Sequence, residues 1–146
     1  MHDHDHGRNP TPDRPHRWPG VAPPGWPRGV RPPGDAGWEE TAVAWLFDLC
    51  PPGFRNYDVL RKYPVILARM AHQHVTATLA AARDGYGTAR LDLRDAIPVH
   101  AIDGVLRMYE YEGSRAAATE RAVDLVERAL AGERWHVRPR TPDPTD

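Results

Sequence analysis

Cysteine and lysine are almost absent from this chain of 146 residues. Cys50 is the only cysteine, so no internal disulfide forms and the fold depends on packing. Lys62 is the only lysine among nineteen basic residues, a bias typical of GC-rich genomes rather than of one function. Twenty acidic residues give a formal net charge of −1, which argues against bulk attraction to nucleic acid or to an anionic membrane.

Long apolar runs are also missing. No stretch approaches the 18 or so apolar residues that a membrane span requires, and no basic start followed by an apolar segment marks a secretory signal. Together with the single cysteine, this predicts a cytoplasmic protein that does not bind membranes.

Familiar catalytic and cofactor motifs are absent as well. The sequence has no glycine-rich phosphate loop, CxxC, HExxH or GxSxG motif. A di-iron bundle needs two Glu-x-x-His pairs on helices, and the only match is Glu133 with His136. The remaining isolated candidates are a cysteine, an acid–base pair and a run of acids: Cys50; His100 with Asp103; and Glu120, Asp124 and Glu127. None has a catalytic partner beside it in sequence, so we expect no cofactor and a protein that is not an enzyme.

Proline marks where order begins and ends. Of sixteen prolines, nine precede residue 34 and three follow residue 138. Such proline-rich segments bury too little apolar surface to offset the entropy of ordering. We therefore expect a disordered arm at 1–37, a helical domain at 38–135 and a disordered tail at 136–146, with Trp135 folded back as a cap.

What the sequence does have is helical periodicity. Apolar residues recur every three or four positions from Pro64 to Asp84, and Gly85 suits a helix stop. Ile66, Ala77 and Ala81 widen the apolar stripe, which predicts a helix covered on more than one side. Other helices are expected from Trp38 to the prolines at 51–52, from about Asn56 to Tyr63, and from about Thr88 to Ala96.

A second long helix is expected from Val99 to Gly132, or two shorter helices broken at Gly113. A heptad stripe of Ile102, Tyr109, Ala116, Val123 and Leu130 runs along it, so a homo-oligomer is one expectation. The predicted fold class is all-α: a small four- to five-helix bundle with two long, roughly antiparallel helices, flanked by disordered proline-rich tails.

Two stretches resemble small uncharacterised helical proteins of high-GC actinobacteria. They are WLFDLCPPGFRNYDVLRKYPVILARMA at 45–71 and AVDLVERALAG at 122–132. The resemblance implies a helical protein and carries no activity with it.

One group of basic residues is interleaved with aromatic ones between residues 55 and 69. Tyr57 and Tyr63 lie among the four cations Arg55, Arg61, Lys62 and Arg69. Cations for a phosphate backbone and rings for stacking are what a nucleic-acid or anion site uses. Packing of the tyrosines and a solvated basic face explain the same residues, and we favour that interpretation because the chain is slightly acidic.

The N-terminal arm carries two further candidate sites. Trp18 and Trp26 each precede a proline and are candidates for docking in a groove of this domain or of a partner. His2, His4 and His6 alternate with aspartates and offer ligands for zinc, nickel or copper, although a flexible histidine tract binds such metals incidentally.

His72 and His74 stand two residues apart on the central helix. Residues at that spacing point in nearly opposite directions, so the pair cannot chelate one metal. One of them, turned inward near Tyr109, would line a pocket between the two long helices. Our leading hypothesis is a non-enzymatic cytoplasmic interaction or adaptor module with an unknown protein partner. The alternatives are a nucleic-acid-associated regulator and a small-molecule-binding regulator or enzyme using that pocket.

Overall fold

The computed structural model describes residues 20–136. This part of the chain is all-α, as predicted, and contains no strand. Its elements are α1 (Trp38–Asp48), a 3₁₀ helix η1 (Pro52–Asn56), α2 (Asp58–Lys62), α3 (Pro64–Asp92) and α4 (Val99–Leu130). Every helix within residues 20–136 is too short or too polar to span a bilayer.

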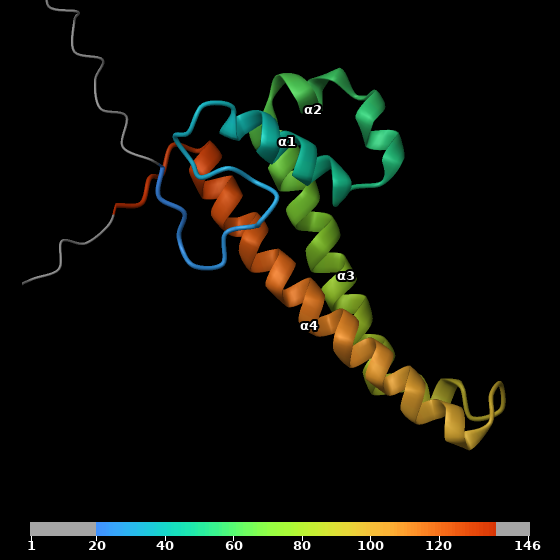
Figure 1. Ribbon diagram of the computed structural model, residues 1–146. Helices are drawn as coiled ribbons and strands as arrows, with labels where there is room; N and C mark the ends of the chain where they lie inside the picture. Colours follow the sequence, from blue (N-terminus) through green and yellow to red (C-terminus); the bar gives the residue numbers. More distant parts are fainter. Residues whose placement is uncertain (1–19, 137–146) are drawn as a thin grey trace, which may run out of the picture.

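The two long helices form an antiparallel hairpin (Figure 1). At one end, α1, η1, α2 and residues 20–37 gather around them; we call this end the head. The rest of the hairpin, which ends in the turn at 93–98, extends away from the head as a stalk. The stalk therefore consists of two helices alone, and each has faces that no other element covers.

The hydrophobic core is concentrated in the head. Its largest fully buried side chains are Leu46 of α1, Leu67 of α3, and Val123 and Val126 of α4. A smaller cluster of Ala89, Ile102 and Leu106 closes the far end of the stalk. Within residues 20–136 no polar or charged side chain is buried, so burial of apolar area is the main stabilising term.

The predicted helix stop at Gly85 is wrong, because α3 continues to Asp92. The expected short helix from Thr88 to Ala96 is wrong for the same reason. Gly85 serves a close approach between helices: a Cβ atom there would lie 2.4 Å from Cε1 of Tyr109 on α4. The missing side chain makes room for the Tyr109 ring.

The last helix is continuous through Gly113, which resolves the two predicted alternatives. Ile102, Ala116 and Val123 of its heptad stripe are buried, and at Gly113 a Cβ atom would stand 3.8 Å from Cβ of Ala82 on α3. These three side chains thus pack inside the hairpin, where they are not free to meet a second copy. Gly132 has a φ of 105° just after the helix, in keeping with its predicted role as a stop.

Residues 20–37 lie against the head, where the sequence analysis expected a disordered arm. Two Pro-Pro-Gly turns shape the segment: Trp26 N–H donates to the Pro23 carbonyl at 3.1 Å, and Asp35 N–H donates to the Pro32 carbonyl at 3.1 Å. The glycines at 25 and 34 have φ of 89° and 94°. Proline followed by a glycine at positive φ is the pattern of a type II turn. The prolines of this segment therefore fix the course of the backbone.

Three tryptophans join the two ends of the described chain. The Trp26 ring centroid lies 6.3 Å from that of Trp38 and 6.1 Å from that of Trp135. The Trp26 indole also donates to the Val30 carbonyl at 2.9 Å. Trp26 therefore docks on this domain, one of the two alternatives raised above, and Trp135 folds back onto the core as expected.

Candidate functional site

The expected pocket residues do not come together. His72 Nδ1 lies 2.9 Å from Oε2 of Glu127 on α4, so this ring sits at the edge of the α3–α4 contact. His74 instead packs edge-on against Phe54 of η1, with ring centroids 5.2 Å apart. Tyr109 lies farther along the stalk, beside Gly85. The structure thus separates the three residues, and a site that combines them does not form.

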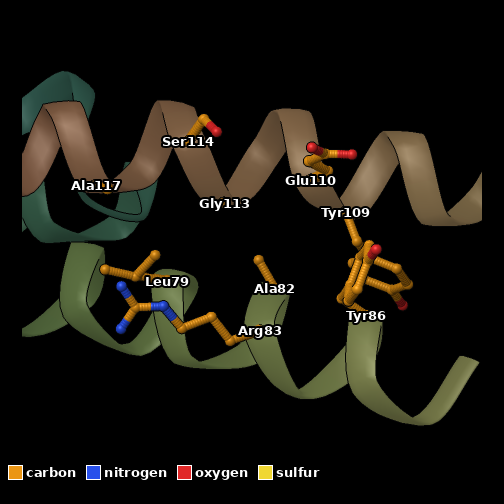
Figure 2. Close-up of a pocket in the computed structure, with 9 residues that line it drawn as sticks. All are labelled: Leu79, Ala82, Arg83, Tyr86, Tyr109, Glu110, Gly113, Ser114 and Ala117. Atoms are coloured by element: carbon orange, nitrogen blue, oxygen red, sulfur yellow. The ribbon is translucent and has the colours of Figure 1, made fainter.

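Tyr109 does line a hollow, of about 380 Å³, in the stalk. Its wall includes Tyr86 and Arg83 from α3 and Glu110 from α4 (Figure 2). The view shows the Gly113 backbone, without a side chain, facing Ala82 across the hollow. The hollow holds no histidine or cysteine that could act as a nucleophile or a metal ligand.

Two of the four predicted basic residues already contact other groups within the head. Arg55 forms an ion pair with Asp48 at 2.6 Å, and Arg61 donates to the Arg55 carbonyl. Both guanidinium groups also lie over the Phe47 ring, at 5.8 and 5.3 Å from its centroid. These contacts hold α2 and η1 against α1, which gives the two arginines a structural role.

Lys62 and Arg69 are placed differently. The Lys62 ammonium lies over the Tyr63 ring at 5.6 Å, and both Lys62 and Arg69 are exposed. Arg69 lines a surface hollow with His72 and Glu127, at the contact between α3 and α4. The four cations therefore do not form one free basic patch.

Exposed large apolar side chains are closely spaced in sequence around α2 and the first turn of α3. Ten large apolar side chains of the described residues are exposed, and five of them fall between residues 57 and 66. We call these five the α2 corner; they are 41–57 % exposed: Tyr57, Val59, Tyr63, Val65 and Ile66. Ile66, Ala77 and Ala81, which were expected to widen the covered stripe of this helix, are all exposed.

Backbone hydrogen bonds join the two helices that carry the α2 corner. Tyr63 N–H donates to the Val59 carbonyl at 3.0 Å, and Ile66 N–H donates to the Tyr63 carbonyl at 2.9 Å. The chain thus turns at Tyr63 directly from α2 into α3, so neighbouring turns carry the exposed side chains. The first turn of α3 contains no acid, whereas Arg61 and Lys62 end α2. The apolar surface has a basic border.

Cys50 is confirmed as a buried side chain at the end of α1. Burial raises the pKa of its thiol, and nearby Arg55 lowers that pKa by a smaller amount. A thiol with a raised pKa is mostly protonated at neutral pH and is a poor nucleophile.

The acids that the sequence offered as a cation site are engaged elsewhere. Glu120 accepts a hydrogen bond from Thr76 at 3.1 Å, Glu127 contacts His72, and Asp124 pairs with Arg128 at 3.6 Å. Glu133 also pairs with Arg128, through two hydrogen bonds of 2.7 and 2.6 Å. Over residues 20–136, no three His, Cys, Asp or Glu side chains are grouped to hold a metal.

Other candidates stand apart or lie outside the described residues. Asp103 is 3.9 Å from Arg90, and His100 is exposed at the start of α4. Trp18 and the three histidines at positions 2, 4 and 6 lie outside the described residues.

No family model, curated protein or solved structure matches this chain. The resemblance to small actinobacterial helical proteins stays a prediction, and function has to be argued from the geometry alone.

Proposed function

We propose that this protein is a non-enzymatic interaction module of the cytoplasm and that the α2 corner is its docking surface. The observation that carries the proposal is the concentration of exposed apolar side chains at residues 57–66. Exposed apolar patches cost solvation free energy and typically mark sites that a partner covers.

The chemistry of the α2 corner favours a protein partner. Tyrosine is enriched at protein interfaces because it buries a large ring at a low cost in side-chain entropy. Val59, Val65 and Ile66 present branched aliphatic groups, which pack well against apolar side chains and offer no flat ring for a base to stack on. Lys62, the exposed cation beside these side chains, favours a partner with an apolar anchor and an acidic residue next to it.

The same geometry argues against the nucleic-acid alternative. Arg55 and Arg61 already contact Asp48 and the Phe47 ring, so binding phosphates would break contacts that hold the head together. Lys62 and Arg69 remain, and two cations supply only a small share of the charge neutralisation that such binding uses.

The proposal is tested by affinity capture from the native host with matched variants. Tyr63→Ser with Val65→Gln removes two side chains of the α2 corner; Tyr63 is the residue before α3, where serine is a favoured helix cap, so the helix should persist. Leu91→Gln is the control, because Leu91 is 67 % exposed on α3 but lies at its far end. Circular dichroism confirms that each variant is folded.

We expect one protein to be captured by the wild type and by Leu91→Gln but lost with the corner variant. Loss of an aromatic anchor weakens an interface by roughly thirtyfold. Lys62→Glu should also weaken capture if the partner is acidic. Equal recovery with all variants, or recovery only of material removed by nuclease, would contradict the proposal.

A further inference from the structure

The hollow beside Tyr109 has small groups on its floor and large ones on its wall. Ala82 of α3 and Gly113 of α4 face each other at the floor, so only small groups lie there, while Tyr86 and Tyr109 rise beside them (Figure 2). Helices approach to 8–10 Å according to the size of the side chains between them. The small groups on the floor let another helix approach α3 and α4 closely at this point, which lies in the stalk, outside the head.

Two opposite charges border this hollow. Arg83 stands on α3 and Glu110 on α4, and both are exposed. Neither belongs to any ion pair formed within residues 20–136. Figure 2 shows the Arg83 side chain extended along α3, away from Glu110. Each charge is thus available to a group that enters the hollow from outside.

We infer that the occupant is the stalk of a second copy of this chain. A two-fold contact requires a self-complementary surface, on which residue i meets residue j of the partner and j meets i. With α3 of each copy over α4 of the other, Arg83 of one copy meets Glu110 of the other, twice. The charges on the two sides of the hollow have the signs that this arrangement requires, and the result is a four-helix bundle along the stalk.

Of the heptad stripe of α4 this interface uses only Tyr109, which borders the hollow, whereas Ile102, Ala116 and Val123 are buried against α3 of the same chain. It also uses no residue of the α2 corner. A result that contradicts the dimer therefore leaves the proposed docking function untouched, and the reverse also holds.

Sedimentation velocity over a concentration series tests the inference. The wild type should reach twice its chain mass of 16.4 kDa. Arg83→Glu and Glu110→Arg each place like charges together at both contacts, which should weaken dimerisation by about tenfold or more. The double variant Arg83→Glu/Glu110→Arg restores opposite charges and should return the dissociation constant to the wild-type value.

Arg115→Glu is the matched control, since Arg115 is exposed on α4 but lines a different hollow, with Asp48 and Thr78. It should leave the dimer unchanged. The inference is overturned if the wild type stays monomeric at about 100 µM, where a dimer with a dissociation constant of about 10 µM would predominate. It is also overturned if both single reversals leave the dimer intact, or if the double variant fails to restore it.

Discussion

Gly85→Ala is expected to destabilise the protein, although the same change in most helices stabilises. Gly85 lies inside α3, and alanine is favoured over glycine in a helix interior by about 1 kcal/mol. In this structure, however, the new methyl group would meet Cε1, Cζ and Oη of Tyr109 at 2.4, 2.5 and 2.9 Å. Relieving an overpacked contact costs about 1–3 kcal/mol. The net expectation is a loss of about 1 kcal/mol in the free energy of unfolding.

Gly87→Ala provides the matched control two residues away in the same helix. No atom lies within 4 Å of a Cβ placed at Gly87, so this variant should gain about 1 kcal/mol. The free energies of unfolding of the two variants should therefore lie on opposite sides of the wild-type value and differ from each other by about 2 kcal/mol. Removing the ring with Tyr109→Ala should reverse the sign at Gly85, because the methyl group then has space.

Urea unfolding followed by circular dichroism measures the free energy of unfolding of the wild type, the three single variants and the Gly85→Ala/Tyr109→Ala double variant. A Gly85→Ala variant as stable as Gly87→Ala in the wild-type background would refute the reasoning, since it would show that the Tyr109 ring does not occupy the space beside Gly85. A Gly85→Ala loss that persists with Tyr109→Ala would refute it as well.

Three further predictions concern the head. Trp26→Ala should lower the free energy of unfolding by about 2 kcal/mol, roughly half the cost of deleting a fully buried tryptophan, as measured by urea unfolding. Cys50 should react with a thiol reagent at least about tenfold more slowly in the native protein than in urea, because burial raises the pKa of its thiol. Hydrogen bonds from Arg128 lower the pKa of Glu133. Its contribution to stability is present above the unfolded pKa, about 4.3, and lost as the pH falls through the lower folded pKa. Glu133→Gln should therefore reduce Tm at neutral pH, and that difference should shrink in acid.

The helices could be predicted because their signals are local. Pro64 is the first residue of α3, and Pro98 directly precedes α4. The spacing of apolar residues identifies both long helices. The predicted helix stop at Gly85 was wrong because a glycine can either end a helix or make room for a side chain of a neighbouring helix. Only the position of Tyr109, 24 residues later, distinguishes the two roles, and helical periodicity does not encode that contact.

The proline-rich segment shows what composition alone misses. Residues 20–37 look disordered by proline content, yet the repeated Pro-Pro-Gly triplets at 23–25 and 32–34 carry a turn signal that was available in the sequence. Trp26, between the two triplets, supplies the apolar contact that fixes the segment on the head.

The candidate surface was only partly predictable. The basic and aromatic residues at 55–69 could be recognised as a group, but the pairing of Arg55 with Asp48 and of both arginines with Phe47 depends on tertiary packing. Exposure of Val59, Val65 and Ile66 depends on which face of the helices other elements leave uncovered. A single sequence does not specify that face.

The most direct test of the α2 corner is site-specific photocrosslinking in the native host. A photoreactive residue replaces Val59 in one variant and Leu91 in the other; both side chains are exposed and apolar, at opposite ends of the region from α2 to α3. Our account predicts a discrete protein adduct from position 59 that is absent from position 91. Adducts to nucleic acid, or the same set of adducts from both positions, would contradict the assignment of the α2 corner as the docking surface.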